Sequence, residues 1–362
     1  MTDFTVNNTL EAQTLEWIAT QQSVMVQNLW TLASINSGSY NVEGVNKVAD
    51  TLALWSKVLD CELEYIPMPP HEVVDDFGNR NQKPLGQALR LFKRPQAPTQ
   101  VFLCAHMDTV FPIDHPFQTI TQLDEDTING PGVADLKGGI VVMLKALEAF
   151  ERSSLQEKLG WEILFNPDEE IGSPSSSALF GNIAKRHHLG LIYEPSFADG
   201  NLAGARKGSG NFAVVTKGKA AHAGREHHIG RNALRVMADF TSALDDLNGQ
   251  QQGITINPGF IQGGGAVNIV PDTCTMRFNI RIEHSKQQAW CEAQIAIILA
   301  TINAKDGITI ELHGGFGRAP KVLSPANETL CKLVQSCGES LGLALEFLPT
   351  GGCCDGNNLA AA

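Results

Sequence analysis

The segment Val101-Phe-Leu-Cys-Ala-His-Met-Asp-Thr109 decides the expected fold class. Its first five residues form a short apolar run, which is typical of a buried strand in a parallel sheet. His106 and Asp108 follow two residues apart, so their side chains should point to the same side of the strand end. In an open α/β sheet, ligands bind in the crevice at the carboxyl ends of the strands. We therefore expect His106 and Asp108 to face a binding site.

Three acidic motifs follow this strand. They are Asp135 in Gly130-Pro-Gly-Val-Ala-Asp-Leu-Lys-Gly-Gly139, Glu169 and Glu170 in Asn166-Pro-Asp-Glu-Glu-Ile-Gly172, and Glu194 in Leu191-Ile-Tyr-Glu-Pro195. Strand-like runs precede the last two motifs, and a helix-like run, Lys137 to Phe150, follows the first. The motif residues are thereby predicted to lie on four successive strand ends. Alternating strands and helices predict an α/β domain with a mostly parallel sheet.

Each motif also has a plain structural interpretation. Asp135 can cap the following helix, the Glu pair can form a solvated turn, and a His-x-Asp at a strand end is often structural. These interpretations do not predict that all the positions fall on successive strand ends. Imidazole and carboxylate groups are zinc ligands, and a carboxylate such as Asp108 can orient a zinc-bound histidine. One glutamate of an adjacent pair can bind a cation while the other serves as general base.

Composition restricts the class of protein. A chain of 362 residues exceeds the usual size of one hydrophobic core, so two domains are expected. The net charge of -12 argues against nucleic acid or an anionic membrane as a partner. The first residues lack the pattern of a signal peptide, and no run approaches ~20 apolar residues. The eight cysteines lack metal-finger spacing and predict reduced thiols in the cytoplasm.

A change of pattern predicts an inserted domain. Residues 208–317 contain alternating strands and two helix-like runs, without a cluster of metal-type ligands. We therefore expect a catalytic domain built from residues 1–207 and 318–362, interrupted by an α+β domain of residues 208–317. The chain contains no strand-linked Gly-x-Gly-x-x-Gly fingerprint of a dinucleotide enzyme. Cys353-Cys354 lacks an adjacent histidine that would activate a thiol nucleophile.

At this point the motifs carry a resemblance. The chain resembles the two-zinc amidohydrolase and metallopeptidase family. The resemblance rests on an ordered set of motifs, which are His106-Met-Asp-Thr-Val110, Gly-x-x-Asp-x-Lys-Gly-Gly, Glu-Glu-x-Gly-Ser and Glu-Pro. This family contains glutamate carboxypeptidase, aminoacylase, acetylornithine deacetylase and peptidase T, and the spacing is most similar to the glutamate carboxypeptidase branch. The resemblance implies an α/β zinc-hydrolase domain, with a mostly parallel sheet, and an inserted ferredoxin-like dimerisation domain.

The resemblance also implies roles for the acidic cluster. His106 and Glu194 would bind one zinc ion and Glu170 the other, while Asp135 would bridge the two. Asp108 would support His106. Glu169 would be the general base that takes a proton from the attacking water and returns it to the leaving amine. Two zinc ions per subunit are implied, with cobalt or manganese as alternatives.

Further site residues follow from the same resemblance. His222 of Ala220-Ala-His-Ala-Gly224 would reach the active site of the partner subunit in a homodimer, where it would bind the oxyanion. Asn268 and Arg281 resemble residues that contact the substrate carboxylate, for which a guanidinium is well suited. Arg281 could instead be a surface charge on a strand. Gly351 and Gly352 resemble a substrate-binding loop.

The implied function is a zinc-dependent amide hydrolase. Its substrate would be a small peptide or an N-acyl amino acid with a free carboxylate, and release of C-terminal glutamate is one form of this activity. An alternative is an N-acyl-amino-acid deacylase of the aminoacylase or acetylornithine deacetylase type. The family's second zinc ion takes a further histidine, which we expect beyond Ala362. Its absence from the sequence leaves open a metal-poor binding protein of the same fold.

Overall fold

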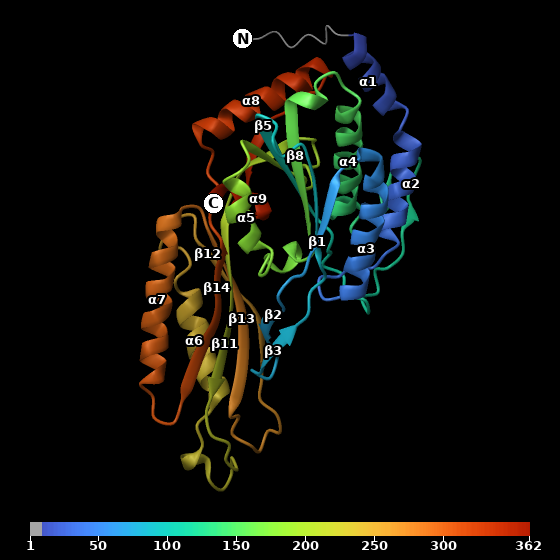
Figure 1. The fold of residues 1–362 in the computed structure, drawn as a ribbon. Coiled ribbons are helices and arrows are strands. Elements are labelled where there is room, and N and C mark those ends of the chain that lie inside the picture. Colours follow the sequence, from blue (N-terminus) through green and yellow to red (C-terminus); the bar gives the residue numbers. More distant parts are fainter. Residues whose placement is uncertain (1–8) are drawn as a thin grey trace.

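The computed structural model describes residues 9–362 and contains two main sheets, each with its own helices and hydrophobic core (Figure 1). Residues 1–8, which include the stretch predicted not to be a signal peptide, lie outside the described residues. No helix within residues 9–362 has the length and apolar character needed to cross a membrane.

Nine α-helices are present in the described chain. Their bounds are α1 Thr9–Ala19, α2 Gln22–Ala33, α3 Val42–Trp55, α4 Gly138–Glu151, α5 Ser177–Ala184, α6 Ala233–Asp245, α7 Ser285–Asn303, α8 Pro325–Ser340 and α9 Asp355–Ala361.

Fifteen strands accompany them in residues 9–362. They are β1 Glu62–Ile66, β2 His71–Val74, β3 Arg80–Lys83, β4 Ala88–Lys93, β5 Thr99–His106, β6 Thr121–Gln122, β7 Ile128–Asn129, β8 Leu159–Asn166, β9 Leu189–Ile192, β10 Leu202–Arg206, β11 Gly208–Lys217, β12 Thr255–Gly263, β13 Thr273–Ile282, β14 Thr309–Arg318 and β15 Phe347–Thr350.

The central sheet has the strand order β1-β4-β8-β5-β9. Strands β8, β5 and β9 are parallel neighbours, and β4 pairs antiparallel with both β1 and β8. The sheet is therefore mixed, with β4 alone running against the other four strands. The α/β architecture with a separate second sheet confirms the predicted fold class.

Alternating residues of β5 bury the two faces of the central sheet. Val101 and Leu103 pack into a core shared with α2, α3 and α4. Phe102 and Cys104 belong to a second cluster that contains Phe180 of α5 and has Leu359 of α9 packed against it. Successive strand residues point to opposite faces, so the apolar run of β5 binds helical layers on both sides.

The second main sheet has the order β12-β13-β11-β14 and is antiparallel throughout. Its chain order, βαββαβ with α6 and α7 as the helices, is that of a ferredoxin-like domain. Both helices cover one face of the sheet, and Phe240 of α6 is fully buried against that face (Figure 1). The opposite face is directed toward the β2–β3 hairpin of the first part of the chain.

Several local predictions differ from the structure. Apolar residues from Thr14 to Ile35 recur at roughly helical spacing, which predicts one helix. The structure has two helices there, because α1 ends at Ala19 and α2 begins at Gln22. Strand β4 and the β2–β3 hairpin had no strong sequence pattern; the hairpin residues Arg80–Lys83 are all exposed and polar. Strand β15 pairs with β10 in a small parallel sheet, which joins the final part of the chain to the segment before β11.

Candidate metal centre and active site

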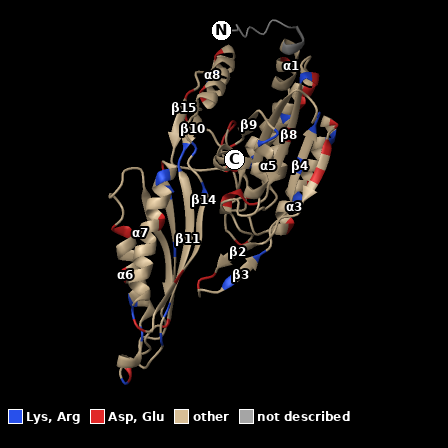
Figure 2. Cartoon of the chain, turned by 60° about the vertical axis from the view of Figure 1, so that its left-hand side comes forward, with Lys and Arg blue, Asp and Glu red and all other residues tan. Residues whose placement is uncertain are grey.

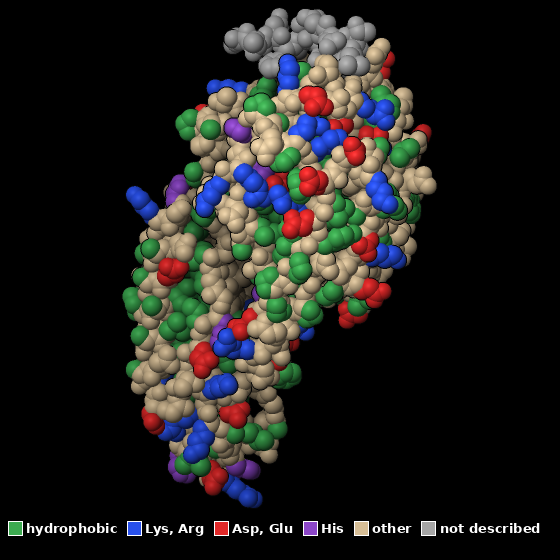
Figure 3. Space-filling view, in the orientation of Figure 1, with side chains coloured by type: hydrophobic (Ala, Val, Ile, Leu, Met, Phe, Trp, Pro, Cys, Tyr) green, Lys and Arg blue, Asp and Glu red, His purple; other side chains and the backbone are tan. Residues whose placement is uncertain are grey.

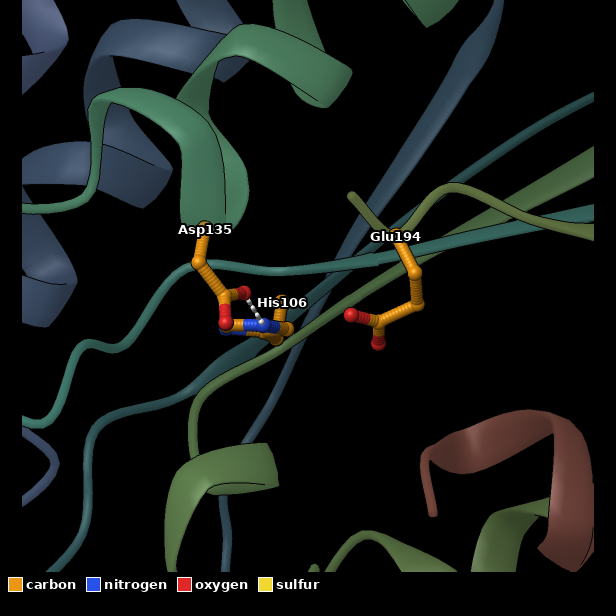
Figure 4. A group of neighbouring side chains, drawn as sticks. All are labelled: His106, Asp135 and Glu194. Carbon is orange, nitrogen blue, oxygen red and sulfur yellow. Dashed lines mark hydrogen bonds and ion pairs between the residues drawn. The ribbon is translucent and has the colours of Figure 1, made fainter. Parts of the chain in front are cut away.

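Three neighbouring parallel strands end at the same edge of the central sheet and bring their motifs together. His106 is the last residue of β5, Glu169 and Glu170 follow β8, and Glu194 follows β9. Asp135 arrives differently from the prediction, because it lies in an irregular turn directly before α4 and does not follow a strand of the central sheet. Figure 4 shows its side chain directed toward His106 from the turn above the sheet edge.

His106, Asp135 and Glu194 form a compact set of possible metal ligands. One ligand atom from each residue lies within 4.8 Å of the others (Figure 4). His106 Nε2 lies 3.1 Å from Asp135 Oδ1. Glu169 Oε2 lies 4.0 Å from the same nitrogen. One imidazole nitrogen and two carboxylate groups suit a zinc ion with an open coordination position.

The support of His106 differs in detail from the prediction. His106 Nδ1 lies 2.9 Å from the backbone oxygen of Asp108 and 3.4 Å from its carboxylate, so a proton on Nδ1 is donated mainly to the carbonyl. The Asp108 carboxylate instead accepts hydrogen bonds from Ser39 Oγ and from the backbone N–H groups of Glu169 and Glu170. Asp108 therefore orients the imidazole and also anchors the segment that carries the predicted base.

The three glutamates of the site are crowded, with Glu169 buried and Glu170 and Glu194 half-buried, and the pKa of each is raised. Burial raises the pKa of Glu169 to about 7 although His106 and Arg318 oppose the shift. Burial is also the largest cause that raises the pKa of Glu170 and of Glu194 to about 8, with neighbouring carboxylates adding to it. A bound cation would relieve this repulsion. The residues present therefore fit a metal ion.

Arg318 was not singled out in the sequence, yet it lies in the site. Its Nη2 is 2.7 Å from Glu169 Oε1 and donates to the Glu169 backbone oxygen and to Ser173 Oγ. Ser173 in turn donates to the buried carboxylate of Asp355. Arg318 is the last residue of β14 in the second sheet. In the sequence it is a single charge in a Gly-rich run, and no motif there predicts a functional residue. Only the fold brings it to Glu169.

The predicted substrate residues separate into two groups. Arg281 on β13 donates from Nε to Asn279 and contacts Cys353 Sγ through Nη1 at 2.9 Å. Cys353 directly follows the Gly351-Gly352 pair, so this loop and Arg281 lie together. Arg318 also contacts the Cys353 sulfur, at 3.6 Å, which connects this group to Glu169.

His222 and Asn268, the other predicted site residues, lie away from the His106 cluster. The backbone N–H of Ala223, next to His222, donates to the Asn268 carbonyl, and His222 bridges to Ile269. Both segments lie at the end of the second sheet where β11 finishes, at the bottom of Figure 1. Strand β11 separates that end from the first domain by about 30 Å, given the rise per residue of a strand. Within one chain, the structure does not bring these two residues to His106.

Comparison with known proteins gives the class. The peptidase dimerisation domain model matches residues 204–307, and the peptidase family M28 model matches residues 90–194. Carboxypeptidase G2 of Pseudomonas sp. is 26% identical over 79% of this chain and 71% of its own length. Acetylornithine deacetylase of Photorhabdus laumondii is 26% identical over 71% of this chain and 66% of its own length. Other carboxypeptidase relatives are matched over about half of their length.

Solved structures share the fold. An M20 family metallo-carboxypeptidase from Sulfolobus solfataricus superimposes with a TM-score of 0.71 at 15% identity, covering 92% of this chain and 87% of that one. In sequence and fold the chain is therefore similar to metallopeptidases and amide hydrolases.

Proposed function

We propose that this protein is a zinc-dependent amide hydrolase that cleaves a peptide or N-acyl bond next to an amino acid with a free carboxylate. The observation that carries the proposal is the His106–Asp135–Glu194 ligand set with Glu169 Oε2 4.0 Å from His106 Nε2. Glutamate is our first choice for the released residue. Similarity to an acetylornithine deacetylase supports removal of an N-acyl group as the second candidate.

The chain's own residues would divide the work of hydrolysis. When bound, zinc would polarise the amide carbonyl and lower the pKa of a water molecule. Glu169 would take the proton from the attacking water and deliver it to the leaving amine. Arg318 and Asp108 would hold Glu169 in place through the side-chain and backbone contacts described above. Glu170 would serve the second metal position, which Asp135 would share.

Arg281 would bind the substrate carboxylate, and its replacement tests this. We expect Arg281→Gln to raise KM for N-acetyl-glutamate by about 10- to 100-fold, because a charge-assisted hydrogen bond is lost. We expect little change of kcat. The control Arg152→Gln removes an Arg far from the site on the first domain, where it pairs with Glu148.

The substrate itself supplies a second check on this proposal. The α-amide of N-acetyl-glutamate keeps the side-chain carboxylate but lacks the free α-carboxylate, so wild-type protein should hydrolyse it poorly, and Arg281→Gln should change that rate little. Hydrolysis of the carboxylate and amide forms with equal kcat/KM would contradict a carboxylate-binding role for Arg281 and this statement of the substrate class.

His222 would act in the active site of the partner subunit, which supports a homodimer through the inserted domain. The dimerisation-domain match and the distance of His222 from His106 both favour this arrangement. In Figure 3, hydrophobic side chains gather over the inserted domain where α7 lies, and Ile297 of α7 is well exposed. We propose the domain division 1–207, 208–317 and 318–362, with Asn268 beside His222 in the composite site.

A mixed dimer tests the shared site. His222→Ala and Glu169→Ala homodimers should each be nearly inactive, whereas a mixed dimer purified with two tags should regain activity. In it, one site has an intact Glu169 together with His222 of the partner subunit. The recovered kcat per mixed dimer should be about half that of wild type if sites work independently. A mixed dimer as inactive as its parents would refute catalysis in trans.

We further propose a cytoplasmic protein with no nucleic-acid or membrane partner. All eight cysteines are free thiols. Figure 2 shows Lys and Arg scattered over both parts of the described chain, where a nucleic-acid site would gather them on one surface. The net charge of -12 supports the same conclusion.

A further inference from the structure

A cavity lies between the β2–β3 hairpin and the face of the inserted sheet that α6 and α7 leave uncovered. Its volume of about 950 Å³ lies in the upper part of the range for small-molecule sites. One end of the cavity is lined by Tyr40 and Asn211, which lie next to the segments that carry Asp108 and Glu169. Ser39, next to Tyr40, donates to Asp108, and a carbon added to Gly172 would lie 3.7 Å from Asn211 Nδ2.

Three asparagines lie side by side in the sheet wall of this cavity. The strand register pairs Asn211 of β11 with Asn279 of β13, and Asn279 with Asn257 of β12. Asparagine is depleted in strands, so three in adjacent positions on one face are not explained by sheet formation. The row is about 10 Å wide, since neighbouring strands are about 4.8 Å apart.

The row has unused hydrogen-bonding capacity. The side-chain amide of Asn279 already makes hydrogen bonds within the protein. Its Nδ2 donates to Asn211 Oδ1 at 2.7 Å, and its Oδ1 accepts from Arg281 Nε at 2.8 Å. Within residues 9–362, the structure gives no hydrogen-bond partner to Asn211 Nδ2 or to the side-chain amide of Asn257. Both residues line the cavity. Amide donors and an amide acceptor therefore remain for a ligand.

Two acidic residues of the cavity pair with arginines, while Asp75 accepts hydrogen bonds from Asn79 and Asn81, and Lys83 also lines the cavity. Asp76 pairs with Arg277 at 2.6 Å, and Glu72 pairs with Arg80 at 2.8 Å. The Arg277 guanidinium lies over the Phe260 ring, 4.6 Å from its centre. The sheet wall of the cavity therefore presents a row of side-chain amides beside the planar Arg277 guanidinium and Phe260 ring. This chemistry matches the planar, uncharged groups of a peptide backbone.

We propose that this cavity binds an extended peptidyl chain on the acyl side of the cleaved bond, with Asn211 and Asn257 hydrogen-bonding to its peptide groups. The inference rests on the proposed hydrolase function and on Arg281 as the carboxylate-binding residue. Arg281 and Arg277 lie on the same face of β13, four residues and thus about 14 Å apart. That length accommodates about four extended residues. Asn257 lies opposite Asn279, two strand positions from Arg281, where it would face the chain that precedes the released residue.

Paired substrates test the proposal. Acetyl-Ala-Ala-Ala-Glu and acetyl-Glu are assayed with zinc-loaded wild-type protein, Asn257→Ala and the control Gln262→Ala. We expect Asn257→Ala to lower the ratio of kcat/KM for the long to the short substrate about five- to tenfold, mainly through KM. Gln262 is exposed on the same strand outside this cavity, so its variant should leave the ratio within about twofold of wild type. A ratio unchanged by Asn257→Ala overturns the proposal.

Direct binding separates failure of this proposal from failure of the hydrolase function. Calorimetry with acetyl-Ala-Ala-Ala-Glu is performed on the Glu169→Ala protein, with and without Asn257→Ala. A Kd weakened about five- to tenfold by the second substitution supports the cavity, even if no amide is hydrolysed. An equal Kd, or no binding by protein with an intact Asn257, overturns it. Asn257 is exposed and has no partner to lose, and equal Tm values of all variants check that folding is preserved.

Discussion

Replacing Glu169 with alanine is expected to lower kcat for hydrolysis of N-acetyl-glutamate by about 10²- to 10⁴-fold, the usual contribution of a general base. Glu169 is buried, its Oε2 lies 4.0 Å from His106 Nε2, and burial raises its pKa to about 7. A carboxylate in this position can accept a proton from the attacking water and release it to the leaving amine. The measurement is steady-state kinetics on protein with verified zinc content.

Controls for this variant follow from its surroundings. Alanine removes the nearer of the two carboxylates that pair with the buried Arg318, so a lower Tm is expected. Glu169→Gln keeps the side-chain shape while removing the base. Both variants should lose activity at temperatures where they remain folded. Glu157→Ala removes an exposed acid and should retain wild-type kcat. Unchanged hydrolysis by folded, zinc-loaded Glu169→Ala protein would refute both the base assignment and the proposed mechanism.

Asp135→Ala is expected to reduce zinc binding at both metal positions, because we propose Asp135 as their shared ligand. Activity should fall by about 10³-fold or more, since the metal supplies several kcal/mol of transition-state stabilisation. The Asp135 side chain is 53% exposed, so its loss should change Tm little in metal-free protein. Elemental analysis of dialysed protein gives the zinc content per chain, and kinetics on the same sample give the activity.

The matched control for Asp135 is Asp126→Ala, an exposed acid in the preceding loop. It should bind as much zinc as wild type. A chelator should inactivate wild-type protein, and added zinc should restore it. If Asp135→Ala retained full zinc content and activity, the cluster with His106 and Glu194 would not be the metal centre. Wild-type protein that binds no zinc would instead favour a binding protein without turnover.

Much of the fold was predictable because its signals are local. The apolar run of Val101–Ala105 corresponds to β5, Trp161–Phe165 to β8, and the helical run after Lys137 to α4. Strand β4 was missed, and so was the hairpin His71–Lys83, whose exposed polar strand has no alternating pattern. The single helix predicted from Thr14 to Ile35 was wrong because apolar periodicity continues across the turn at Thr20 and Gln21.

The sequence by itself determined the residue types of the site and their order, because each motif follows a strand or turn whose pattern is local. It could not determine which distant side chains join them. The tertiary structure alone decided that Arg318 reaches Glu169, that Ser39 reaches Asp108, and that Asp135 enters from a turn before α4. It also decided the asparagine row, because cross-strand register joins positions that the chain separates. Such contacts depend on how strands align and pack, which local spacing does not specify.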